Sequence, residues 1–148
     1  MEDRNGTSAL IAAGAAVALL AGCGGGGGGS SSTTSGSDDV RAVTQNFVKA
    51  FGAGDGKTAC TLLTPAGQAA FVKKVGGPLG VKDCTHAVAA AHGEAAAELN
   101  LDFAGASVKS VTVNGSTASA VVAAGGRSLN AQLSNAGGSW KLTRVPGL

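Results

Sequence analysis

Two cysteines and two histidines near the middle of the chain are the residue types best suited to hold a metal ion. Cys60, Cys84, His86 and His92 follow the spacing C-x23-C-x-H-x5-H. This spacing lacks the close ligand pairs that are typical of zinc sites. It therefore argues against a metal site, and a disulfide between Cys60 and Cys84 is the alternative.

General acid or base catalysis requires a suitable side chain that points into a pocket. Residues 103–148 contain no Asp, Glu, His, Cys or Tyr, so such a group must come from the helices that precede them. His86 and His92 lie about 120° apart around one predicted helix and do not share a face. We expect His86 to face water. His92 is closer to the apolar stripe, and Asp102 stands beside Phe103, which makes these two the candidate pocket residues.

Both candidates also fit simpler roles. His92 suits a histidine that flanks the apolar stripe at the surface, and Asp102 suits a turn before the strands. The motifs G-x-S-x-G and H-E-x-x-H and a paired-carboxylate pattern are absent from the sequence. We therefore expect no catalytic residue, no metal and no cofactor.

An apolar run lies near the start of the chain, at 9–20. As a helix this run reaches about 18 Å, short of the ~30 Å of bilayer hydrocarbon, so it predicts the core of a signal peptide rather than a membrane span. It ends in L-A-G-C at 20–23, which resembles the bacterial lipobox. The resemblance implies a signal peptide over 1–22, a diacylglyceryl group on Cys23, and a lipid anchor on the extracytoplasmic face of the cell membrane.

One feature of this leader departs from the lipobox pattern. Secretory signals begin with a positive segment, whereas Glu2 and Asp3 offset Arg4 here. A buried apolar helix with a chance L-A-G-C is the alternative, but the glycine run that follows does not suit a core helix.

Lipidation of Cys23 would leave Cys60 and Cys84 as one pair in an oxidising compartment, where a disulfide is the default. Closing a loop of about 25 residues stabilises a fold by roughly 3 kcal/mol. The bond matters because the predicted core is poor in aromatic residues, with four Phe, one Trp and no Tyr.

Residues 24–37 read GGGGGGSSSTTSGS, a composition that buries no apolar surface. We expect a flexible tether over 23–37 with a mean reach of about 20 Å. A phosphate-binding glycine loop is the alternative, but no strand precedes this segment and no Lys-Ser/Thr pair follows it. The remaining residues, 38–148, suffice for one domain.

The domain is predicted to be α+β, with helices first. Ser37 is the expected N-cap of an amphipathic helix that ends at Gly52. Asp55, Thr64 and Asp83 are expected to cap three more helices, and the helix that follows Thr64 is expected to end at 76–78. The fourth carries Cys84 on its apolar face and extends to residue 99, unless Gly93 splits it.

The second half alternates between β-branched and polar residues. It predicts strands at 108–113, 117–124, 127–134 and 139–145, joined by turns at 114–115, 125–126 and 137–138. Such short connections favour an antiparallel meander. The alternation changes phase between Val108 and Val111, which indicates a bulge near Ser110.

Several motifs in this domain resemble the NTF2-like (SnoaL-like) cone fold. The first predicted helix ends in F-G-A-G-D, and the last strand reads G-S-W-K-L. A-C-T-L-L-T-P-A-G at 59–67 and C-T-H-A-V at 84–88 are similar to exported actinobacterial members of that family, in which they contain the paired cysteines. The resemblance covers about 38–145 and implies a curved four-stranded sheet around helices, with a pocket that some members use for isomerisation or dehydration and many for binding.

Three functions follow as hypotheses. The first is non-enzymatic binding of a small apolar ligand or a protein partner; the second is an isomerase or dehydratase that uses His92 or Asp102. The third is an envelope module that contacts a neighbour through its sheet. The strand half has four cationic side chains and no acidic one. These cations could bind an anionic surface, and the alternative is that they only solvate the outer face and protect the strand edges. An exported chain with few aromatic residues is not expected to bind nucleic acid.

Overall fold

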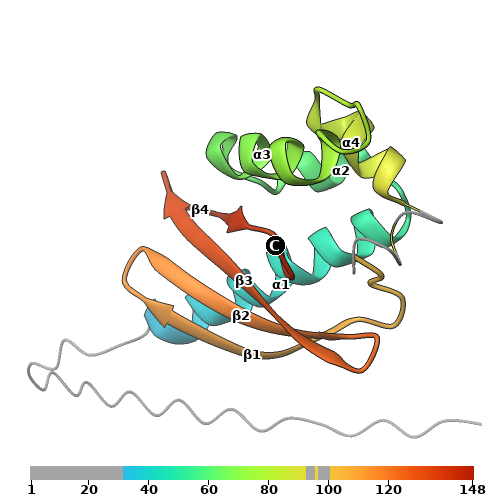
Figure 1. Cartoon of the computed structure of the whole chain (residues 1–148). Coiled ribbons are helices and arrows are strands. Elements are labelled where there is room, and N and C mark those ends of the chain that lie inside the picture. The colour runs from blue at the N-terminus through green and yellow to red at the C-terminus, as the bar shows by residue number, and fades with distance from the viewer. Residues whose placement is uncertain (1–31, 93–95, 97–100) are drawn as a thin grey trace, which may run out of the picture.

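The computed structural model describes residues 32–92, 96 and 101–148. They form an α+β structure in which one long helix lies along a face of a curved sheet, and the short helices gather on the other side of that helix (Figure 1). The helical elements are α1 (Ser32–Gly52), α2 (Gly56–Thr61), α3 (Pro65–Phe71), the π-helical turn η1 (Val72–Gly76) and α4 (Cys84–Ala91).

The four strands form an antiparallel meander, as predicted. They are β1 (Ser107–Asn114), β2 (Thr117–Ala124), β3 (Arg127–Ala136) and β4 (Ser139–Arg144), in the order β1-β2-β3-β4. The first turn differs by one residue from the prediction. Asn114 pairs with Thr117, so the loop is Gly115 and Ser116, and Gly115 supplies the positive φ of 61° that the turn requires.

The predicted bulge in β1 is confirmed. Val108 pairs with Val122, and Ser110 pairs with Val121, which leaves Lys109 as the extra residue. The bulge moves the side chains that follow it to the other phase, so Val111 and Val113 turn toward the core side.

The core lies between α1 and the inner face of the sheet. Val40, Phe47 and Phe51 of α1 are buried, and Ala120 and Val122 of β2 are fully covered. Small residues on the strands leave room for the rings of α1, so alanine and phenylalanine fill the space together. The buried hydroxyl of Thr44 donates a hydrogen bond to the Val40 carbonyl at 2.7 Å, which satisfies the only polar side chain that is buried within the described residues.

The expected start of the first helix is wrong. Helix α1 begins at Ser32, not after an N-cap at Ser37, so 32–37 of the predicted tether are helical. Gly36 and Ser37 are half-buried, and a Cβ on Gly36 would lie 3.8 Å from Val113 Cγ1. The contact of the helix with β1 therefore includes Gly36, which precedes the predicted N-cap. Ser and Thr have only moderately unfavourable helix propensities, so tertiary packing can extend the helix through this segment.

The three predicted caps of the short helices are confirmed. Asp55 accepts from the Thr58 N–H at 3.0 Å, Thr64 from the Gly67 N–H at 3.0 Å, and Asp83 from the His86 N–H at 2.9 Å. Helix α3 changes into the π turn η1 after Phe71, and this helical segment ends at Gly76, as predicted. Helix α4 ends at Ala91 and Ala96 is helical again, which agrees with the alternative that Gly93 splits the predicted helix, while 97–99 lie outside the described residues. His92 is extended, so the helix stops before Gly93, whose low helix propensity favours an end there.

Candidate functional site

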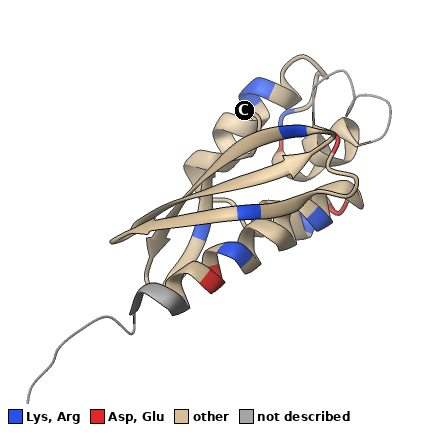
Figure 2. Ribbon diagram, turned by 90° about the horizontal axis from the view of Figure 1, so that it is seen from below, with Lys and Arg blue, Asp and Glu red and all other residues tan. Residues whose placement is uncertain are grey.

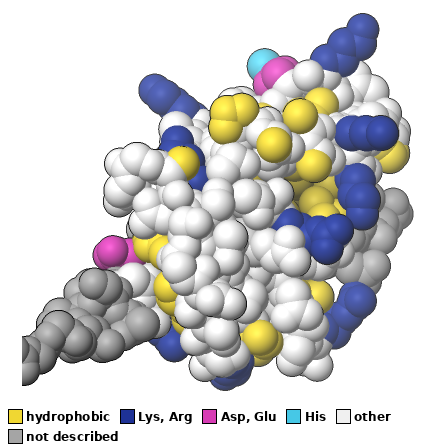
Figure 3. All heavy atoms as spheres, turned by 90° about the vertical axis from the view of Figure 1, so that its left-hand side faces the viewer, with side chains coloured by type: hydrophobic (Ala, Val, Ile, Leu, Met, Phe, Trp, Pro, Cys, Tyr) yellow, Lys and Arg dark blue, Asp and Glu magenta, His cyan; other side chains and the backbone are white. Residues whose placement is uncertain are grey.

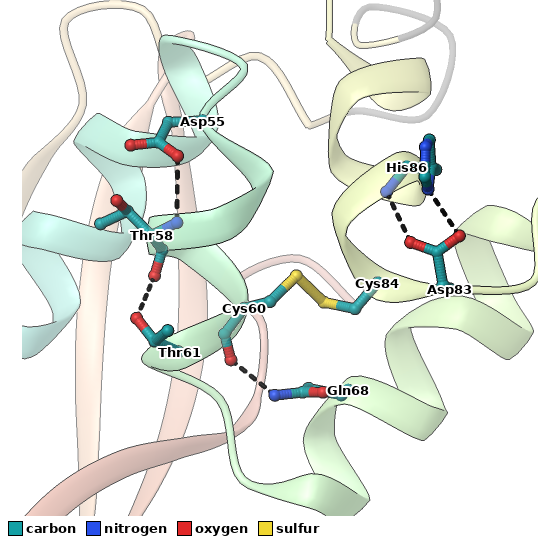
Figure 4. The surroundings of a disulfide bond; sticks show 8 residues. All are labelled: Asp55, Thr58, Cys60, Thr61, Gln68, Asp83, Cys84 and His86. Carbon is teal, nitrogen blue, oxygen red and sulfur yellow. Dashed lines mark hydrogen bonds and ion pairs between the residues drawn. A yellow bond between two sulfur atoms is a disulfide. The ribbon is translucent and has the colours of Figure 1, made fainter.

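The predicted disulfide joins Cys60 of α2 to Cys84 of α4, with Cα atoms 6.1 Å apart (Figure 4). Both cysteines are buried, and the Gln68 side-chain amide donates to the Cys60 carbonyl at 2.7 Å. A bonded pair has no thiolate for a metal. Within the part of the chain that the structure describes, no three His, Cys, Asp or Glu side chains come together as a metal site would require.

His86 faces water, as predicted, and its side chain is 77% exposed. Its Nδ1 lies 2.7 Å from Oδ2 of Asp83, whose other oxygen caps α4 (Figure 4). The hydrogen bond from the His86 backbone N–H stabilises the carboxylate and lowers the pKa of Asp83, and the His86 side chain lowers it further. This pair stabilises the start of α4 and lines none of the hollows described below.

His92 and Asp102 line one hollow of about 290 Å³, although they belong to different segments. His92 follows the end of α4, and Asp102 lies just before β1. Phe51 and Phe103 lie at the bottom, with their ring centroids 5.2 Å apart in an edge-to-face arrangement. Because both rings and Leu101 are buried while His92 and Asp102 are exposed, the hollow has an apolar floor and a polar rim.

The two rim residues are held in place by local contacts. Oδ1 of Asp102 accepts from the Ala104 N–H at 2.9 Å, which is the turn role that Asp102 also suits by sequence. The His92 ring lies over Gly54, where a Cβ would come within 3.1 Å of Cδ2. Among the described residues, no hydrogen bond or ion pair joins His92 to Asp102. The arrangement suits contact with a ligand more than proton relay between the two side chains.

A second hollow, of about 320 Å³, adjoins the first along α1. Gly52, Phe103 and Ala104 line both, while Gln45 and Lys49 line only the second. We call the two hollows together the α1 groove. Gly52 lies where the two hollows meet, and a Cβ on it would encounter no atom within 4 Å, so a larger side chain there has room to extend. Nothing in the spacing of these α1 residues marks them in the sequence, since they fit the polar side of an amphipathic helix.

The chain matches no protein-family model, and the comparisons with curated proteins and solved structures found no match. The resemblance of its motifs to the NTF2-like family therefore stays a prediction.

The charged residues of the sheet are all basic (Figure 2). Lys109, Arg127, Lys141 and Arg144 are exposed on the strands. On the outer face of the sheet, Thr112, Ser119 and Gln132 line a shallow depression, and Val121 and Ala123 of the same face are half-buried. The depression is lined mainly by polar side chains.

The leader, the lipobox and Cys23 lie outside the described residues. The helices that the structure does describe include none with both the length and the apolar character of a membrane span.

Proposed function

We propose that the chain is a lipid-anchored protein of the cell envelope whose NTF2-like domain binds a small, largely apolar ligand in the α1 groove without converting it. The lipobox at 20–23 supports the anchor and the extracytoplasmic location. The Cys60–Cys84 disulfide supports an oxidising compartment. Helices packed on one face of a curved antiparallel sheet support the cone fold.

The observation that favours binding is the aromatic floor of the groove. Phe51 and Phe103 form an edge-to-face pair, and Phe51 makes a second such contact with Phe71 at 6.0 Å. A floor that is fixed by packing on both sides changes little when a ligand arrives, so little conformational entropy is lost on binding. Lys49, His92 and Asp102 at the rim would orient the polar end of the ligand.

The position of His92 and Asp102 on one hollow supports a second candidate, an isomerase or dehydratase. A base in this groove would remove a proton next to a carbonyl group. The test substrate is cyclohexanone in D₂O, and NMR measures the incorporation of deuterium at the carbon next to its carbonyl group. If His92→Gln or Asp102→Asn abolishes this exchange but still binds the ketone, the result would establish the isomerase or dehydratase activity.

No comparable observation favours the envelope module that uses its sheet. Such a module requires an exposed apolar patch. Among the described residues the one exposed large hydrophobic side chain is Leu79, which is 36% exposed and belongs to the segment before α4.

The binding test uses the full chain with Cys23→Ser and the neutral fluorescent probe N-phenyl-1-naphthylamine. Gly52→Trp would fill the groove from an open position, so we expect it to weaken probe binding about tenfold or more. The control is Ala69→Trp, an exposed position on α3 that lines none of these hollows and should bind as the parent does. Equal binding by the parent and Gly52→Trp, or no binding by the parent, would contradict the proposal.

A further inference from the structure

A separate slot lies between the α3–η1 segment and the end of β4. It has a volume of about 90 Å³, and Ala70, Phe71, Lys74, Arg144, Val145 and Leu148 are among the residues that line it. Figure 3 shows this face of the molecule, where Lys and Arg side chains border a hollow with hydrophobic side chains at its bottom. The slot shares no lining residue with the α1 groove.

Two close backbone approaches hold the α3–η1 segment, which forms one side of this slot. Gly67 brings α3 against β4, since a Cβ there would lie 2.7 Å from the Leu142 carbonyl oxygen. Gly76 brings the end of η1 against the next loop, with its Cβ position 2.7 Å from the Val81 oxygen. The π turn η1, which carries Lys74, ends at the second of these glycines. Single π turns are rare and frequently occur at functional sites because they redirect side chains that a regular helix would place elsewhere.

The bottom of the slot is apolar and its edge is cationic. Phe71 and Val145 are buried, and Leu148 is half-buried. Lys74 and Arg144 are exposed at the edge. Within the described residues neither cation has a side-chain hydrogen bond or an ion pair. No Asp or Glu lines the slot, and residues 103–148 contain none.

We propose that this slot binds a small amphiphilic anion, with a carboxylate or phosphate group between Lys74 and Arg144 and a short alkyl or acyl group on Phe71 and Val145. Both head groups accept hydrogen bonds from guanidinium and ammonium groups, and partial exclusion of water by the apolar floor strengthens the attraction. The volume is well below the range of about 300–1,000 Å³ for whole drug-sized ligands, so only a short apolar group fits inside.

Titration of the ¹⁵N-labelled full chain with Cys23→Ser tests this site. Sodium hexanoate and hexyl phosphate are the anionic probes, and hexan-1-ol and hexyltrimethylammonium are the neutral and cationic comparisons. The readout is the saturable shift of the amide signals of Gly67, Phe71 and Val145. Both anions are expected to produce it, and their relative affinity distinguishes a carboxylate from a phosphate ligand.

Matched variants separate the slot from general charge. Lys74→Gln and Arg144→Gln should each weaken hexanoate binding about three- to fivefold. The controls Lys57→Gln and Lys109→Gln remove the same charge from exposed positions outside the slot and should leave the affinity unchanged. Ala70→Trp should block the slot, whereas Ala89→Trp on α4 should not.

Three results would overturn the proposal. The first is hexan-1-ol binding as tightly as hexanoate, because the cations would then contribute nothing. The second is an equal loss of affinity in the control variants, which would indicate attraction by net charge alone. The third is binding to phosphatidylglycerol vesicles without any binding of the soluble anions, which would indicate a membrane contact in place of a ligand slot.

Discussion

The ring of Phe51, near the end of α1, meets the ring of Phe103 edge to face at a centroid distance of 5.2 Å, and so joins the helical half of the chain to the strand half. Phe51 also contacts Phe47 at 5.9 Å and Phe71 at 6.0 Å. It is thus the common neighbour of the other three phenylalanines, and the same ring forms part of the floor of the α1 groove.

Replacement of Phe51 by alanine should therefore be among the most damaging single changes in the core. It removes a ring that is 1% exposed and leaves a cavity between three others, which typically costs about 3–5 kcal/mol of unfolding free energy. Urea unfolding measures this loss. Leu79→Ala, at an exposed position, should change the unfolding free energy by less than about 0.5 kcal/mol. A similar small effect at both positions would contradict the packing described here.

Loss of the Cys60–Cys84 bond should lower stability by about 3 kcal/mol, since it frees a loop between residues separated by 24 positions. The measurement compares urea unfolding of the Cys23→Ser chain with and without a reductant. The Cys60→Ala/Cys84→Ala chain serves as the control, because a reductant should not affect it. Equal stability of the oxidised and reduced chains would show that the bond does not constrain the fold.

Gly67→Ala should destabilise the protein by about 1–3 kcal/mol. The added Cβ would lie 2.7 Å from the backbone oxygen of Leu142 and push α3 away from β4. Gly52→Ala is the matched change in open space, and there we expect stability to be unchanged or to rise by up to about 1 kcal/mol. Thermal unfolding of the two variants side by side measures the difference, and the opposite order would refute the close approach.

The cap of α4 should make stability depend on pH in the acid range. The hydrogen bond from the His86 N–H lowers the pKa of Asp83 in the folded protein, so this carboxylate stabilises the fold above its unfolded pKa of about 3.9. That contribution is lost as the pH falls through the lower, folded pKa.

The advantage of the parent over Asp83→Asn should therefore shrink between about pH 5 and pH 2, since asparagine still caps the helix but carries no charge. Urea unfolding across this range is the measurement. Asp39→Asn, at an exposed acid of α1 that caps no helix, is the control. A difference that stays constant or grows as the pH falls would have the wrong sign for this cap.

Cys23→Ser should move the protein from the membrane fraction to the soluble fraction of an expressing bacterium, and should abolish incorporation of labelled palmitate. The physical reason is the loss of the acyl chains, each of which contributes about 0.8 kcal/mol per buried CH₂. Cys60→Ser/Cys84→Ser serves as the control, since it should leave the label in place. Continued tight association of Cys23→Ser with membranes would contradict the lipobox.

The strands could be predicted from the local sequence pattern. Alternation of polar and apolar residues, punctuated by glycine pairs, predicts all four strands to within two residues at each end, and even the bulge near Ser110. Hairpin pairing is a local event, so the residues of a strand and its turn contain most of what determines it. Caps behave in the same way, because Asp55, Thr64 and Asp83 each bond to an N–H three residues later.

Two helix boundaries could not be predicted from the local sequence. Helix α1 begins at Ser32, and Gly36 lies near Val113 of β1, a contact that nothing in a serine-rich segment predicts. The π turn after Phe71 depends on the contact of Gly76 with the loop at Val81. Tertiary contacts decide such boundaries because the intrinsic preference of these residues is weak.

By itself, the sequence determined the order of the elements, the predicted anchor at Cys23, and the choice of His92 and Asp102 as candidates, because these depend on residue types and on spacing along the chain. Only the tertiary structure decided that His92 and Asp102 line one hollow over Phe51 and Phe103, and that Lys74 and Arg144 border one slot with an apolar floor. Phe51 and Phe103, like Lys74 and Arg144, are far apart in sequence and meet only when α1, α3 and the sheet pack, and that packing is set by burial of the whole core rather than by any local motif.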